Sequence, residues 1–184
     1  EQELRQKNRD LSLLNRVANQ LAESHSVEEI LDHCLQTLCQ SFQMVGGGIY
    51  LSRENRSRLK LAAHRNLTPE EEQVLLELDP RQSIIGQALL TGRPYAATDL
   101  ASHPLLAAPL VVQNGWQSLQ TVPLTSQTET VGVLFLFDRK NRPFSPDEVQ
   151  LLLAAGNQIG TAINGAELNA ALKWQGRLTQ ASNR

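Results

Sequence analysis

The sequence contains little of what several common functions need. It has only two cysteines in 184 residues, and aromatic side chains make up 4% of it. It contains 17 Lys and Arg residues and 19 Asp and Glu residues, which gives a formal net charge of -2. Because a protein that holds a nucleic-acid backbone needs a surplus of basic side chains, we expect no nucleic-acid partner.

Long apolar runs are also absent. No stretch approaches the ~20 apolar residues that a membrane-spanning helix needs, and the opening EQELRQKNRD is too polar for a secretory signal. We therefore expect a cytoplasmic protein without direct membrane contact. Hydrophobic residues still form 41% of the chain, which is enough for one domain with a sizeable core. Because neither end carries the signals of a domain terminus, we expect the chain to be a segment of a longer protein.

The two cysteines predict packing and not chemistry. Cys34 and Cys39 lie five residues apart in a segment with helical periodicity, which places them about 140° apart around the helix axis. They cannot then share a metal ion or form a disulfide with each other. We expect both to be reduced core residues, and the sequence gives no sign of a covalent bilin, a haem or a metal site.

The first 25 residues predict a helix with a narrow apolar seam. Leu4, Leu11, Leu14, Ala18 and Leu21 fall on the a and d positions of heptads, and polar residues fill the remaining face. This pattern predicts a signalling helix that pairs with the same helix of a second copy, so we expect a homodimer through the flanking helices. The alternative is an amphipathic helix that folds back on its own domain.

The middle of the chain predicts helices and two hairpins. A capping box at Ser26 and Glu29 opens a helix that runs to about Phe42. Three glycines then lead into a hairpin of residues 49–52 and 59–66, residues 67–78 predict a short helix, and residues 118–124 and 130–138 predict a second hairpin. Between Asp99 and Trp116 we expect a long loop with at most a short helix over 108–114. Because VGVLFLF is apolar without alternation, both faces of the sheet must be covered.

The last helix has the best-defined start in the chain. Ser145 is a predicted N-cap, Pro146 suits the first helical position, and Asp147 and Glu148 complement the positive end of the helix. The apolar pattern then continues to Leu172, and such a helix would be about 45 Å long. A domain of this size cannot cover that length, so we expect residues 169–184 to project as a connecting helix.

Three motifs in order resemble the GAF domain family. SIIGQALLTGRPYAATD (83–99) is followed by TVPLTSQTETVGVLFLF (121–137) and then by FSPDEVQLLLAAGNQIGTAINGAEL (144–168). The resemblance covers residues 26–168. It implies an α/β (α+β) fold in which helices cover one face of a central antiparallel sheet and a loop-and-helix segment covers the other, where the family's ligands bind. It also implies a sensory or regulatory module and not a catalyst.

The N-terminal segment LRQKNRDLSLLNRVANQLAES (4–24) resembles the one that precedes GAF domains in bacterial sensor histidine kinases. The resemblance implies such a kinase as the parent protein, ahead of diguanylate cyclases, cyclic-dinucleotide phosphodiesterases and transcription activators. A kinase's phosphoacceptor histidine and ATP-binding motifs are absent from the sequence, so we expect the chain itself not to be an enzyme. The alternative function is a ligand-free module for dimerisation whose core is filled by its own side chains.

Six residues are candidates for a ligand pocket: His64, Asp99, His103, Trp116, Ser118 and Gln120. Ser118 and Gln120 share one face of a predicted strand with Val122 and Leu124. Each candidate also has a simpler explanation, as a strand-edge, turn, capping or core residue, and none has partners at metal spacing. Residues 138–148 depart from the family's cyclic-nucleotide signature NKxnFxxxDE, so the identity of a bound small molecule stays open.

Overall fold

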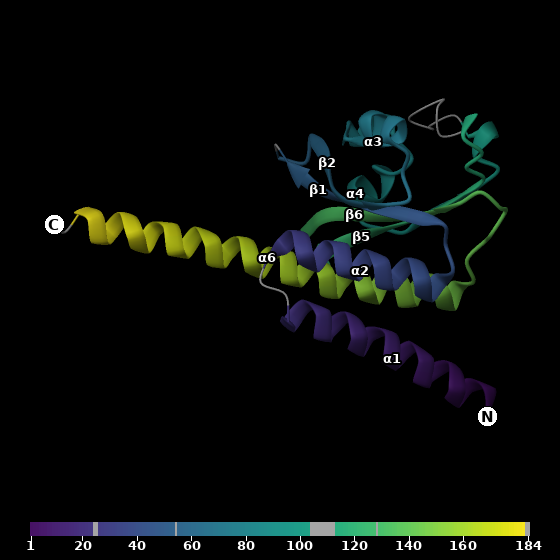
Figure 1. Cartoon of the computed structure of the whole chain (residues 1–184), viewed down its shortest axis with the longest axis horizontal. Helices are drawn as coiled ribbons and strands as arrows, with labels where there is room; N and C mark the ends of the chain where they lie inside the picture. The colour runs from purple at the N-terminus through teal and green to yellow at the C-terminus, as the bar shows by residue number, and fades with distance from the viewer. Residues whose placement is uncertain (24–25, 54, 104–112, 128, 183–184) are drawn as a thin grey trace.

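The computed structural model describes residues 1–23, 26–53, 55–103, 113–127 and 129–182 (Figure 1). Its helices are α1 (Gln2–Glu23), α2 (Val27–Phe42), α3 (Pro69–Leu75), α4 (Gln87–Thr91) and α6 (Pro146–Ser182), with short 3-10 turns η1 (Pro80–Gln82) and η2 (Leu100–Ser102). Its strands are β1 (Gly46–Arg53), β2 (Arg58–Arg65), β3 (Glu77–Leu78), β4 (Tyr95–Thr98), β5 (Ser118–Ser126) and β6 (Glu129–Asp138). They form one antiparallel sheet in the order β3-β2-β1-β6-β5-β4. The expected α+β fold with a central antiparallel sheet is confirmed.

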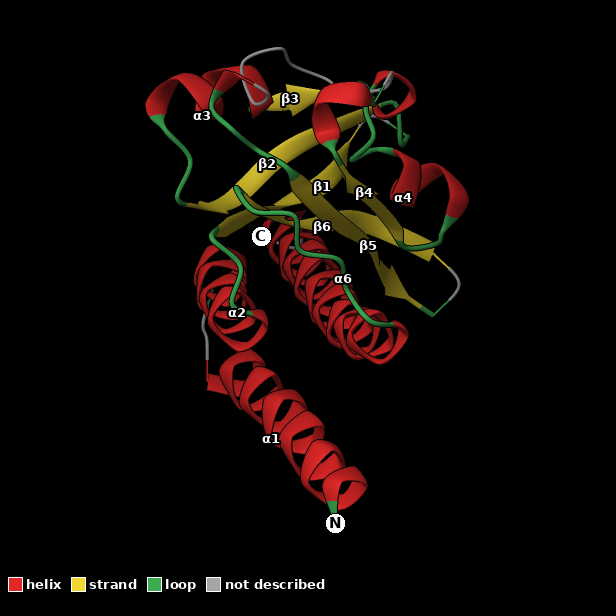
Figure 2. Cartoon of the chain, turned by 90° about the vertical axis from the view of Figure 1, so that its right-hand side faces the viewer, coloured by secondary structure: helices red, strands yellow, loops and turns green. Residues whose placement is uncertain are grey.

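Helices α2 and α6 lie side by side across one face of the sheet, and α1 lies outside them (Figure 2). The capping box that opens α2 is present, since the Ser26 side chain accepts a hydrogen bond from the Glu29 N–H at 3.2 Å. Cys34 and Cys39 are buried in the apolar core that these helices share with the sheet. Burial raises the pKa of the Cys34 thiol to about 12 and that of Cys39 to about 11, so both are protonated packing residues as expected.

Two glycines let α6 lie directly on β5. A Cβ atom at Gly160 would lie 2.4 Å from the Thr125 carbonyl oxygen, and one at Gly156 would lie 2.9 Å from the carbonyl oxygen of Pro123. The helix is 37 residues long, or about 55 Å at 1.5 Å per residue. Every described residue from Glu167 onward is exposed, and the helix extends well beyond the sheet (Figure 1). The expectation that its C-terminal part projects is confirmed.

Helix α1 contacts its own domain along its C-terminal half. Its fully buried residues are Leu13 and Val17, and Leu14 and Leu21 pack against the same core with partial burial. Leu4 and Leu11 remain 67% and 59% exposed, and Ala18 is exposed as well. Only part of the predicted seam therefore remains exposed, because Leu14 and Leu21 pack against the core that α2 and α6 share with the sheet.

Two local predictions differ from the structure. The helix predicted over 67–78 ends at Leu75, because Glu77 and Leu78 form a strand that pairs with Lys60 and Leu59 of β2. Strand pairing here overrides a helical pattern that would otherwise continue. The first hairpin strand begins at Gly46 and not at Ile49, and the helix predicted over 108–114 lies largely outside the described residues.

The triple glycine at the start of β1 permits a close approach to the backbone of β6. A Cβ atom at Gly47 would lie 2.4 Å from the Phe135 carbonyl oxygen on the neighbouring strand. A side chain at this position would therefore push β1 away from β6.

Among the described helices, none combines the length and the apolar character needed to cross a membrane.

Candidate functional site

The face of the sheet opposite α2 and α6 is covered by α3, α4 and the connections around them (Figure 2). Apolar and aromatic side chains fill most of this layer; they include Tyr50, Leu59, Leu75, Ile84, Leu89, Leu100, Trp116, Leu119, Phe135 and Phe137. The Tyr50 hydroxyl donates a hydrogen bond to the Leu75 carbonyl at 2.5 Å, which satisfies its one buried polar group. Two other polar groups in this layer are not satisfied in this way.

The first is the indole N–H of Trp116, just before β5. Its ring stacks on Phe137 with the ring centroids 3.7 Å apart and an interplanar angle of 2°. The side chain is only 3% exposed, and its Nε1 has no hydrogen-bond acceptor among the described residues. Buried donors are rarely left in this state, since each costs about 1–3 kcal/mol.

The second is the carboxylate of Glu71 on α3. Glu71 is fully buried, and one of its oxygens closes a capping box by accepting the Thr68 N–H at 3.2 Å. That oxygen also lies 3.9 Å from the Arg139 guanidinium, while Oε2 has no donor among the described residues. A charge inside a protein needs more than one long contact to balance its lost hydration.

Arg139 connects these two groups. Its Nε donates a hydrogen bond to the Asn114 carbonyl at 3.2 Å, two residues before Trp116. Its guanidinium carbon lies 5.9 Å from the centroid of the Phe137 ring, on which Trp116 stacks. The two residues that carry the unsatisfied groups, Trp116 and Glu71, are therefore linked through Phe137 and Arg139.

Trp116 also borders an open cleft of about 420 Å³. The cleft is lined by Asp99, Leu100, Ala101, Gly115, Trp116, Gln117 and Asn141. It joins η2, the residues that lead into β5 and the connection between β6 and α6. A molecule in this cleft would contact a carboxylate, two amide side chains and the edge of the aromatic cluster.

Two of the six residues predicted from the sequence meet in this cleft, Asp99 and Trp116. Asp99 has a left-handed backbone conformation with φ of 57°, and its carboxylate accepts a hydrogen bond from Ser102 at 2.8 Å. His103 lies nearby and is not a cleft residue; its Nε2 is 3.2 Å from the Tyr95 hydroxyl. The structure thus places Asp99 at the site, where its carboxylate already accepts a hydrogen bond from the Ser102 side chain.

His64 lies on the same face of the sheet but pairs elsewhere. Its Nε2 is 3.2 Å from a carboxylate oxygen of Glu72 on α3, and both side chains are partly exposed. No group of three His, Cys, Asp or Glu side chains suited to a metal ion occurs in the described ranges.

Ser118 and Gln120 occupy the opposite face of the sheet. Gln120 pairs across the sheet with Leu136, which belongs to the core beneath α2 and α6, whereas Leu119 and Phe137 face the aromatic cluster. The prediction that both line the pocket fails because strand alternation sends them toward the helices. Ser118 bonds Lys140 and Arg142, and the Gln120 amide donates to the carbonyls of Tyr95 and Thr121.

Glu71, Arg139 and Asn141 adjoin the site but are not among the residues predicted from the sequence. Glu71 is the middle one of three consecutive glutamates, all of which suit the first turn of a helix. The available signal was its position four residues before Leu75, which puts both on one helix face. Nothing in the sequence brings Arg139 near Glu71, because that contact depends on how α3 lies over the sheet.

Comparison with known proteins agrees with this architecture. The family model of the GAF domain matches residues 24–164. The Nif-specific regulatory proteins of Azospirillum lipoferum and Azospirillum brasilense are each 28% identical over 169 residues, which cover 87% of this chain and 27% of theirs. The chain thus spans about a quarter of the length of these relatives.

Solved structures share the fold at low sequence identity. The GAF domain of an Acinetobacter phosphoenolpyruvate-protein phosphotransferase superposes with a TM-score of 0.75 at 20% identity, covering 88% of this chain and 97% of that one. A domain of a Sinorhizobium meliloti 1021 protein named as a two-component sensor histidine kinase gives a TM-score of 0.67 at 17% identity, covering 82% and 99%.

Proposed function

Because the chain belongs to the GAF domain family, we propose that it is the sensory module of a larger bacterial signalling protein and binds a small molecule beside Trp116. One observation carries the proposal: the buried Trp116 N–H and the buried Glu71 Oε2 have no partners among the described residues. Trp116 stacks on Phe137, the Arg139 guanidinium carbon lies 5.9 Å from the Phe137 ring centroid, and the other carboxylate oxygen of Glu71 lies 3.9 Å from Arg139. A ligand with an acceptor for the indole and a donor for the carboxylate would satisfy both.

The occupant we propose is a small polar molecule and not an apolar one. Glu71 is buried and the Arg139 side chain is 42% exposed, but their charges are opposite, so the pair does not select strongly for ligand charge. The cleft adds the Asp99 carboxylate and the Gln117 and Asn141 amides. Such groups, few in number and placed around an aromatic surface, are typical of small-molecule sites.

We propose a sensor histidine kinase as the parent protein, with a transcription regulator as the second choice. The first rests on the resemblance of residues 4–24 to kinase segments and on the fold shared with a protein named as a sensor histidine kinase. The second rests on the Nif-specific regulatory proteins. In either parent, any catalytic or DNA-binding output would lie in another domain.

We also propose that the flanking helices join two copies of the chain. Leu4 and Leu11 on α1 and Leu168, Leu172, Trp174 and Leu178 on α6 are between 55% and 67% exposed. A helix that projects from its domain with large apolar side chains in water gains stability when a second helix covers them.

Charge at these positions should therefore separate the copies. We expect Leu172→Glu with Leu178→Glu to halve the solution mass measured by light scattering, and Leu4→Glu with Leu11→Glu to weaken the assembly at low micromolar concentration. Leu90→Glu on α4, at a side chain 46% exposed on the domain itself, is the matched control and should leave the mass unchanged. An unchanged mass in both double variants would refute dimerisation through these helices.

A ligand-free module for dimerisation is the second candidate function. It is favoured by the apolar side chains that fill most of the layer beneath α3 and α4. On that view the unpaired Trp116 N–H would be a tolerated cost of about 1–3 kcal/mol, and the Glu71 carboxylate a larger one. The two functions therefore differ in whether any metabolite stabilises the chain through Glu71.

Tryptophan fluorescence can report directly on the site. The chain has two tryptophans, and Trp174 lies on the projecting part of α6, so Trp174→Phe leaves Trp116 as the only tryptophan. In a screen of a defined library of bacterial metabolites, we expect at least one compound to change Trp116 emission and raise the melting temperature. Glu71→Gln keeps a residue that can form the capping box but removes the negative charge of the acceptor. This variant should weaken the binding of that compound about tenfold or more, which corresponds to about 1.4 kcal/mol.

Two results would count against the proposal. If every compound that stabilises the chain does so equally with Glu71→Gln, the ligand site lies elsewhere. If no compound stabilises the chain, the dimerisation module becomes the better account.

A further inference from the structure

The connection between β6 and α6, residues 139–145, borders the cleft and begins the projecting helix. Asn141 lines the cleft together with Trp116 and Gln117. Its two neighbours are both held by the hydroxyl of Ser118, which donates to the Lys140 carbonyl at 2.5 Å and accepts the Arg142 N–H at 2.6 Å. Ser118 is 1% exposed, so these bonds are shielded from water.

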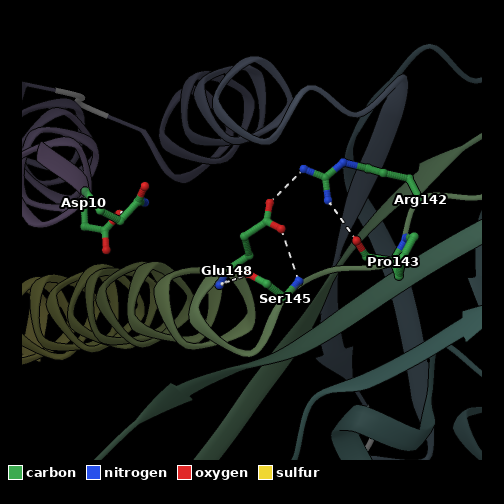
Figure 3. A network of polar contacts seen from close by, with 6 residues as sticks. Asp10, Arg142, Pro143, Ser145 and Glu148 are labelled. Atoms are coloured by element: carbon green, nitrogen blue, oxygen red, sulfur yellow. Dashed lines mark hydrogen bonds and ion pairs between the residues drawn. The ribbon is translucent and has the colours of Figure 1, made fainter. Parts of the chain in front are cut away.

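Arg142 continues this connection to the first turn of α6. Its guanidinium lies 2.7 Å from the Glu148 carboxylate, which also accepts the Ser145 N–H at 3.1 Å (Figure 3). The Glu148 N–H in turn donates to the Ser145 hydroxyl at 3.1 Å, completing a capping box. Partial burial raises the pKa of Glu148, but the hydrogen bonds from Arg142 and Ser145 outweigh it and hold that pKa below its ordinary value.

All three long helices meet at this point. The Arg142 guanidinium lies 4.5 Å from the Phe144 ring, and that ring stacks on Phe42 of α2 at 5.4 Å. Glu148 also lines a groove of about 480 Å³ between α6, α2 and α1, and Asp10 of α1 lines its other side (Figure 3). A displacement of Glu148 would therefore change the surroundings of α1 as well as the start of α6.

We propose that residues 139–145 transmit occupancy of the cleft to α6, with Ser118, Arg142 and Glu148 as the positioning residues. The inference rests on the proposed function, because it takes the cleft beside Trp116 as the ligand site. A molecule that contacts Asn141 shifts Lys140 and Arg142, which Ser118 holds, and Arg142 carries the shift to Glu148. The shift then reaches the start of α6, because the same carboxylate accepts the Ser145 N–H at its first turn.

A second link between the sheet and α6 serves as an internal comparison. Arg53 at the end of β1 lies 3.5 Å from Glu167 on α6, but both side chains are 48% exposed. An ion pair of this kind contributes little and is screened by salt. Glu167→Gln therefore removes the same type of contact from the same helix, away from the proposed route.

The test needs no ligand, because coupling between two places is reciprocal. In the Trp174→Phe background, the indole N–H of Trp116 gives a single resonance whose hydrogen exchange can be followed by NMR. We expect Glu148→Gln and Ser118→Ala each to speed that exchange about fivefold or more relative to the core amides of β6. Glu167→Gln should leave the ratio unchanged.

Non-additivity is the second readout. If Ser118 lies between Glu148 and Trp116, the double variant should speed exchange no more than Ser118→Ala alone. Equal effects of Glu148→Gln and Glu167→Gln, or exchange that rises in step with the core amides, would overturn the proposed route. If no metabolite stabilises the chain but Glu148→Gln and Ser118→Ala still speed the exchange of the Trp116 N–H as expected, the proposed ligand site is refuted. The coupling between the cleft and α6 is then supported.

Discussion

Gly160→Ala is expected to destabilise the fold by about 3 kcal/mol, although it adds a single methyl group to a helix. The added Cβ would lie 2.4 Å from the Thr125 carbonyl oxygen and 2.7 Å from the Thr125 nitrogen and carbonyl carbon. All three are backbone atoms of β5, so no side-chain rotation can make room. The helix must move off the sheet, and the core between α6 and β5 opens with it. Urea denaturation followed by circular dichroism measures the change.

Gly165→Ala is the matched control on the same helix. A Cβ atom at Gly165 would have no heavy atom within 4 Å among the described residues, apart from its chain neighbours and the nearby backbone of α6, so helix propensity is the main change. Alanine is favoured over glycine in a helix interior by about 1 kcal/mol, so this variant should be more stable than wild type. Equal free energies of unfolding for the two variants would mean that α6 does not lie against β5 at Gly160.

Trp116→Ala should destabilise the chain by about 3–5 kcal/mol, whereas Trp116→Phe should stay within about 1.5 kcal/mol of wild type. The alanine variant removes the ring that stacks on Phe137 and leaves a cavity in the apolar layer beneath α3 and α4. The phenylalanine variant retains an aromatic ring and eliminates a buried N–H that has no acceptor among the described residues. Removing such a donor avoids its desolvation cost, which offsets part of the lost contact area.

The functional effects of the two substitutions should be alike. Both substitutions remove the indole N–H, so both should weaken the binding of any metabolite found in the screen about tenfold or more. Thermal shift measures this without relying on Trp116 fluorescence. If Trp116→Phe binds as well as wild type, or loses as much stability as Trp116→Ala, the unpartnered N–H does not have the role we assign to it.

The sequence predicts the parts of this protein whose signals are local. The capping residues Ser26 and Ser145, the two hairpins and the long last helix appear in the structure much as periodicity and capping chemistry predict. The GAF resemblance adds the order of the layers. These features depend on residues a few positions apart, which a single sequence displays directly.

The site depends on longer-range geometry and was predicted only in part. Asp99 and Trp116 could be found because they bracket an irregular stretch, but Glu71 and Arg139 lie 68 residues apart in sequence and meet only when α3 covers the sheet. Ser118 and Gln120 lie on the face opposite to the predicted one, since an almost wholly buried strand does not reveal which of its faces meets the helices. Similarly, the leucine pattern of α1 could not show which residues contact its own domain.

Native mass spectrometry of the purified wild-type chain, with denaturing analysis of whatever is released, tests the central claim most directly. The account predicts one small polar molecule bound per chain, either retained from the cell or acquired from the metabolite library, and its loss in Trp116→Phe and Glu71→Gln. Bare protein in every preparation, or a ligand retained equally by both variants, would contradict a ligand site beside Trp116.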